Sequence, residues 1–172
     1  MFMKLQSAKI LQRGVAVNDK QIKQKVNDVM YAMMKEKGVI APVDVLMEVG
    51  VLSKTDYEAW RRGGVPFLEK VCKVNLRKLS TINREMRAFA KKNNLKSSWT
   101  YYKQWSNGKP KVKKGGQGKP ATPPKLRFSK SGDENIEKQY ATHFISHTTL
   151  GEIKKRRQQA EASDFDAVDA AE

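Results

Sequence analysis

The sequence predicts a mostly α-helical protein: a small helical bundle with a helix-turn-helix-like unit, a disordered basic linker and a short C-terminal α or α+β appendix. Apolar residues recur at steps of three and four through much of the first half of the chain, which is the helical period. A stretch rich in Gly and Pro then interrupts this pattern. The expected parts are an N-terminal arm (1–17), a helical domain (18–106), the linker (107–124), the appendix (125–157) and a disordered acidic tail (158–172).

The first three helices are expected over residues 19–37, 42–48 and 53–62. Asp19 is expected to cap the first helix, and Gly38 tolerates the left-handed backbone that often ends a helix. Pro42 fits the first turn of the second helix, which Gly50 closes. Ser53 is expected to cap the third. End signals of this kind place these helices without any tertiary information.

The later elements follow from the same patterns. Further helices are expected from Pro66, over 76–95, over 98–105, from 133 and from 149, with a strand over 125–129. In the helix over 76–95, Leu79, Ile82, Met86 and Phe89 form one apolar stripe. The segment over 98–105 is expected to be a short aromatic helix. Residues after 158 are acidic or small, so they lack an apolar face to bury.

Positive charge is concentrated in the middle of the chain. Its 172 residues include 34 Lys and Arg against 18 Asp and Glu, a formal net charge of +16. Residues 65–130 alone hold 18 basic and 2 acidic residues, a net +16. Concentrated positive charge binds polyphosphate through counterion release. The sequence therefore predicts a nucleic-acid partner, although a basic solvated surface would have the same composition.

The helix over 76–95 carries the first group of candidate phosphate-binding residues. Six basic side chains lie outside its apolar stripe, where they can face a phosphate backbone: Arg77, Lys78, Arg84, Arg87, Lys91 and Lys92. A guanidinium group binds two phosphate oxygens at once, so Arg84 and Arg87 rank above the lysines. A second group lies in the linker, which has no acidic residue: Lys111, Lys113, Lys114 and Lys119. A flexible basic segment can order on a nucleic-acid backbone.

Four aromatic residues directly precede the linker, and they are Trp99, Tyr101, Tyr102 and Trp105. Aromatic rings next to positive charge are suited to stacking on unpaired bases. The competing interpretation is that the rings close one edge of the helical bundle.

The segment from Pro42 to Arg62 has the order of a helix-turn-helix, with Gly50 in the turn. Its second helix carries Asp56 and Glu58, which phosphate would repel. We therefore expect this unit to position the domain rather than to read bases. The unit is the only reason to favour DNA over RNA.

Few residues in the sequence could form an enzyme active site. His143 and His147 stand four residues apart, so on one helix they could face a single metal ion, with Asp133 or Glu137 as a further ligand. A metal-dependent nuclease is thus an alternative, but we expect no enzyme, no cofactor and no metal. Another alternative is a protein-interaction or ribosome-associated adaptor, for which exposed Met33, Met34 or Trp60 would be the sign.

Two further features concern the cellular location of the protein. The only cysteine, Cys72, excludes an internal disulfide. We expect it to be a small buried apolar residue, and the alternative is that neighbouring Lys70 and Lys73 lower the pKa of its thiol. No apolar run is long enough to cross a membrane. The sequence therefore predicts a cytoplasmic, non-enzymatic protein that binds nucleic acid mainly through phosphate contacts.

Overall fold

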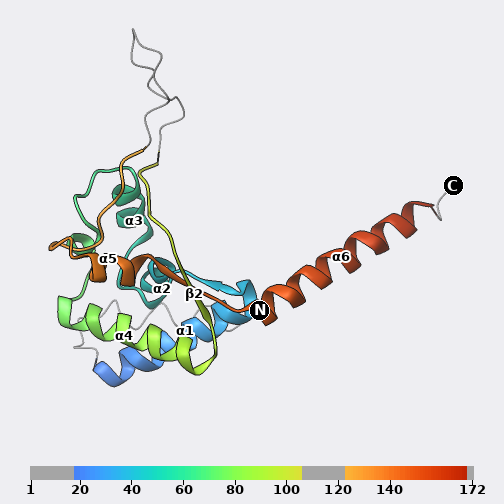
Figure 1. Cartoon of the computed structure of the whole chain (residues 1–172), viewed down its shortest axis with the longest axis horizontal. Helices are drawn as coiled ribbons and strands as arrows, with labels where there is room; N and C mark the ends of the chain where they lie inside the picture. The colour runs from blue at the N-terminus through green and yellow to red at the C-terminus, as the bar shows by residue number, and fades with distance from the viewer. Residues whose placement is uncertain (1–17, 106–122, 170–172) are drawn as a thin grey trace, which may run out of the picture.

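A computed structural model of the chain describes residues 18–105 and 123–169, with side chains up to residue 161. The described residues are mostly helical, as the sequence predicts (Figure 1). In chain order the elements are α1 (Asp19–Lys37), β1 (Val39–Ile40), α2 (Pro42–Val49), α3 (Lys54–Arg61), the 3₁₀ helix η2 (Leu68–Val71), α4 (Leu76–Lys92), β2 (Lys96–Trp99), α5 (Glu134–Ala141), β3 (Thr142–Ile145) and α6 (His147–Asp169).

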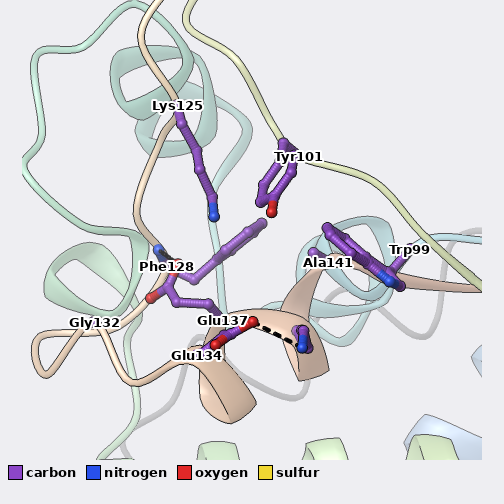
Figure 2. A pocket seen from close by; sticks show the side chains of 9 residues that line it. Trp99, Tyr101, Lys125, Phe128, Gly132, Glu134, Glu137 and Ala141 are labelled. Carbon is purple, nitrogen blue, oxygen red and sulfur yellow. Dashed lines mark hydrogen bonds and ion pairs between the residues drawn. The ribbon is translucent and has the colours of Figure 1, made fainter.

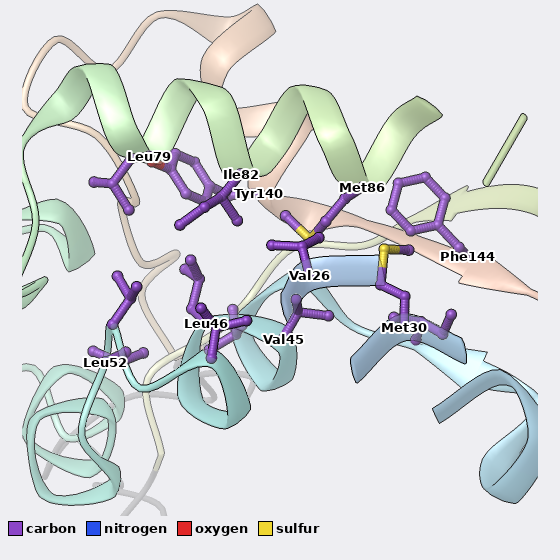
Figure 3. Packing of buried hydrophobic residues seen from close by; sticks show 14 of the residues in the cluster. Val26, Met30, Val45, Leu46, Leu52, Leu79, Ile82, Met86, Tyr140 and Phe144 are labelled. Atoms are coloured by element: carbon purple, nitrogen blue, oxygen red, sulfur yellow. The ribbon is translucent and has the colours of Figure 1, made fainter. Parts of the chain in front are cut away.

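Helices α1 and α4 lie side by side and run in the same direction. Asp19 and Arg77 pair near the starts of the two helices, and Asn27 donates a hydrogen bond to Glu85 eight residues further along both. Their apolar stripes face each other, with Val26 of α1 fully buried (Figure 3). The contact therefore orients α4 so that its opposite face is open to solvent.

A small antiparallel sheet connects distant parts of the chain. Strand β3 is central, in the order β1-β3-β2. Phe144 in β3 faces Ile40 of β1 and Ser97 of β2 in the pairing register. The sequence patterns do not predict β1 and β3, because strands of two to four residues depend on their partners rather than on local periodicity. The sheet places β2 at an edge directly after α4.

The expected appendix is not separate from the helical domain. Leu126, Phe128, Tyr140 and Phe144 are buried in the same core as α1, α2 and α4. Trp60 donates a hydrogen bond of 2.8 Å from its indole N–H to the Arg127 carbonyl. The residues after the basic stretch therefore complete the core that those before it begin.

The prediction of a helix over residues 98–105 is wrong. Strand β2 extends to Trp99, and Lys103 then pairs with Lys125 in an isolated antiparallel bridge. Trp, Tyr and Thr dominate this segment and favour extended backbone. The Gln104 amide donates to the Pro124 carbonyl at 2.9 Å, so the chain enters and leaves residues 106–122 at neighbouring points.

Three smaller expectations need correction. Instead of a helix from Pro66, the chain forms only the single turn of η2. The strand over 125–129 is limited to the bridge at Lys125, although Leu126 and Phe128 are buried and Arg127 is exposed, as in a strand. Helix α6 continues through the expected disordered tail to Asp169, since Gln and Ala at 158–162 favour helix, and it leads away from the body (Figure 1).

Candidate nucleic-acid interface

A row of four cations lines the exposed side of α4. Arg77, Arg84, Arg87 and Lys91 are all exposed. At 100° per residue they fall within an arc of about 80°, and the row is about 21 Å long at 1.5 Å per residue. We name these four residues the α4 basic row. Successive cations along a helix axis can contact successive phosphates of one backbone.

No carboxylate among the described residues of α4 shares this face. The one acidic residue of the helix, Glu85, is half-buried and accepts a hydrogen bond of 2.6 Å from the Asn27 amide of α1. Arg77 has a long, exposed ion pair with Asp19 at 3.7 Å, which competes weakly with a ligand. Within the described chain, Arg84, Arg87 and Lys91 form no ion pair.

The other predicted phosphate-binding residues stand apart from this row. Lys92 is exposed, but on the wheel it falls to one side of the row, about 60° from Arg77, and Lys78, at about 100°, is half-buried. The linker lysines Lys111, Lys113, Lys114 and Lys119 lie outside the described residues.

An exposed pair of aromatic rings follows α4 in the chain. Trp99 is 46% exposed and Tyr101 is 49% exposed. Their rings meet edge to face, with centroids 4.8 Å apart. They border a cavity of about 100 Å³, together with Lys125, Phe128 and residues of α5 (Figure 2). The nitrogen of Lys125 lies 3.6 Å from the centre of the Tyr101 ring.

Two of the four predicted stacking residues have different surroundings. Tyr102 is buried, and its hydroxyl is 2.9 Å from His143 Nε2, so its ring is closed to a base. Burial raises the pKa of the Tyr102 hydroxyl. Trp105 is 38% exposed, but the Arg61 guanidinium lies 4.9 Å from its ring centre. Arg61 was not predicted as a site residue from the sequence. Its position four residues after Tyr57 on α3 is the one signal that could have indicated an arginine next to these aromatic rings, because residues four apart on a helix are neighbours.

The helix-turn-helix-like unit is present as α2 and α3, with Gly50 in the left-handed conformation between them. Trp60 on α3 is fully buried, and Tyr57 packs against it. Glu58 pairs with Arg62 on the same helix at 3.4 Å. With its aromatic side in the core and two carboxylates on its length, α3 is poorly suited to a DNA groove.

No family model matches this sequence, and neither a curated protein nor a solved structure is significantly similar to it. A functional assignment therefore depends on the residues of this chain.

The residues considered for a metal site are used otherwise. Glu137 accepts hydrogen bonds from the Phe128 amide and from both the amide and the hydroxyl of Ser129. Asp133 caps α5, and His143 bonds to Tyr102 from strand β3. His147 is exposed at the start of α6, so the two histidines do not share a helix face. Among the described residues, no three His, Cys, Asp or Glu side chains cluster to hold a metal ion.

The features considered for a protein-interaction adaptor and for a reactive cysteine are not found in the structure as described. Met33, Met34 and Trp60 are buried, so they form no apolar docking patch. Cys72 packs against the core, and burial raises the pKa of its thiol to about 12, with Glu69 and Asp56 adding to the effect; the alternative, a lowering by Lys70 and Lys73, is wrong. None of the helices described in residues 18–105 and 123–169 combines the length and the apolar character that a membrane crossing requires.

Proposed function

We propose that this chain is a non-enzymatic, cytoplasmic nucleic-acid-binding protein that uses the α4 basic row to bind phosphates. The observation that carries this proposal is the row itself: four exposed cations on one helix face, of which only Arg77 has a carboxylate partner among the described residues, the distant Asp19 of α1. A merely soluble basic surface would scatter its charges, and neighbouring acids would balance them. Here Glu85, the one carboxylate of α4, does not balance the row, because it lies toward α1 and accepts a hydrogen bond from Asn27.

The composition of the row suits a polyanion. Three of its four members are arginines, whose planar donors match a pair of phosphate oxygens. Leu79, Ile82 and Met86 on the other side of α4 are buried, which holds the helix and therefore the row in place. Binding through phosphates discriminates little between DNA and RNA, and the preference for DNA is weak because α3 is poorly suited to a groove.

Salt dependence tests this proposal. We would measure affinity for duplex DNA, single-stranded DNA and RNA at several salt concentrations, using the full chain and the double variant Arg84→Gln, Arg87→Gln. Each lost phosphate contact lowers the log–log salt slope by about 0.9 on duplex DNA, so the variant should lose about 1.8. The control Lys35→Gln, Lys37→Gln removes the same charge from exposed positions at the end of α1.

The salt slope of the control variant should differ from that of the wild type by less than about 0.9, the value of one phosphate contact. Equal losses in both variants would assign binding to net charge rather than to the row. Failure of the wild-type protein to bind any of the three nucleic acids at low salt would end the proposal.

A further inference from the structure

Trp99 and Tyr101 are large rings that the fold leaves half open. Each would contribute more to stability if it were buried, as Trp60 and Tyr102 are. Their edge-to-face contact, at an interplanar angle of 88°, orders the two rings without covering them. Exposed aromatic rings in fixed positions are typical of surfaces that bind flat ligands.

The backbone on both sides holds these rings in position. Trp99 pairs with Thr142 of β3 in the sheet register. The Thr100 amide donates to the Ala141 carbonyl, and the Leu126 amide donates to the Tyr102 carbonyl at 2.8 Å. Because the rings are already placed, a ligand that stacks on them does not have to order the loop first.

The charge around the rings is positive where a ligand would approach. Lys125 lies against Tyr101 and forms no ion pair among the described residues. Lys138 Nζ is 5.9 Å from the Trp99 ring centre and pairs with Glu134 at 2.8 Å. That pair neutralises Glu134, and the buried carboxylate of Glu137 is occupied by three donors. Lys125 therefore has no acidic partner among the described residues, and it can exchange its contact with one face of Tyr101 for a phosphate next to a stacked base.

We propose that Trp99, Tyr101 and Lys125 form a base-binding platform, which makes the ligand a single-stranded nucleic acid. The rings would stack on unpaired bases, and Lys125 would contact the adjoining backbone. A paired base within a duplex does not offer its face to a side chain, so the platform selects for single strands. This inference rests on the proposed function, because it assumes that the partner is a nucleic acid.

The platform and the α4 basic row are within reach of one short strand. Trp99 follows Lys92, at the end of α4, by seven positions, which limits their Cα separation to about 25 Å. The chain turns at Asn94, where φ is 51°, and β2 then leads from α4 toward α5 (Figure 1). Lys96 is exposed along this path. An oligonucleotide of about 12 residues is comparable with known single-strand site sizes.

The test compares a labelled single strand of about 12 nucleotides with the matching duplex, using the full chain. The variant Trp99→Leu should bind the single strand about 5- to 150-fold more weakly, the range expected for one lost stacking contact, and should bind the duplex as before. Trp99→Phe, which keeps a ring, should recover part of the affinity. Binding of the single strand should also quench tryptophan fluorescence in the wild type, and less so in Trp99→Leu.

Tyr31→Leu is the matched control. Tyr31 is an aromatic residue that is 54% exposed on α1, and Lys35 lies over its ring as Lys125 lies over Tyr101. It should change neither affinity. If Trp99→Leu weakens single strand and duplex equally, or weakens neither, the platform is wrong while the proposed function stands. If the wild type binds no nucleic acid at low salt, both are wrong.

Discussion

Glu137 should be a main determinant of stability, because one buried carboxylate ties the segment after residue 122 to α5. Its side chain is buried and accepts three hydrogen bonds. The amide of Phe128 donates to Oε2 at 2.9 Å, and the amide and hydroxyl of Ser129 both donate to Oε1 at 2.7 Å. We consider the substitution Glu137→Gln, which keeps the size of the side chain and removes its charge.

The expected cost follows from these three bonds. Glutamine can leave its oxygen near Ser129, where two bonds then lose their charge assistance, about 1 kcal/mol each. Its amide group then faces the Phe128 N–H, which loses its acceptor at a cost of about 1–3 kcal/mol. The free energy of unfolding should therefore fall by about 3 kcal/mol or more. For a chain of this size, that corresponds to a fall in Tm of about 6–12 °C.

Urea unfolding of the purified chain, followed by circular dichroism, measures this change. The matched control is Glu134→Gln on the same helix, where an exposed carboxylate pairs with Lys138. Water replaces the lost partner at an exposed site, so the urea midpoint of this control should stay at the wild-type value. Equal midpoints for Glu137→Gln and the wild type would show that the three bonds do not hold the segment.

Two further predictions concern pH and backbone conformation. Burial lowers the pKa of His143, so its contribution to stability is present above the unfolded-state value and is lost as pH falls through the folded-state pKa. Urea unfolding at pH 7 and pH 5 should show a larger loss in the wild type than in His143→Gln. Gly38 has φ of 67°, and a Cβ there would lie 3.0 Å from the Leu150 side chain, so Gly38→Ala should destabilise by about 1–2 kcal/mol in the same assay. Gly151 has open space in α6, and Gly151→Ala should instead raise helicity in far-UV circular dichroism.

Local rules were sufficient for the helices that end in strong signals. The predicted bounds of α1 match the structure because Gly38 ends it in the left-handed conformation. The cap is Asn18 rather than Asp19, a difference of one residue between two side chains that cap equally well. Ser53 caps α3 as expected, and Asp133 caps α5 at the start expected for that helix. Each of these features depends on residues within one turn of the helix end.

The same local rules could not predict which segments far apart in the sequence pair with each other. Strand β3 directly follows α5 and exists through its pairing with β1 and β2, more than forty residues earlier in the chain. The burial of Leu126 and Phe128 likewise depends on Trp60 and Tyr102. A Gly- and Pro-rich interruption is typical of domain linkers, but a loop between two neighbouring segments of one core has the same composition.

The aromatic segment shows how one local error affects a candidate site. On a helix, Trp99, Tyr102 and Trp105 would share one face by their steps of three. On extended backbone, adjacent residues point to opposite sides, so Tyr101 faces solvent while Tyr102 enters the core. The residue types indicated stacking chemistry, but only the backbone conformation decides which rings are available for it.

Affinity and strand preference should therefore depend on different residues. Between the cations of the α4 basic row the exposed side chains, Ser80 and Ala88, are small, and the row holds no aromatic ring that could stack on a base. As phosphate contacts, Arg84 and Arg87 contribute sequence-independent affinity, so their loss should weaken single strand and duplex together. Trp99 is the first exposed ring after α4, so its loss should change the ratio of the two affinities. A protein in which one variant changed both properties would bind through a single mixed surface instead.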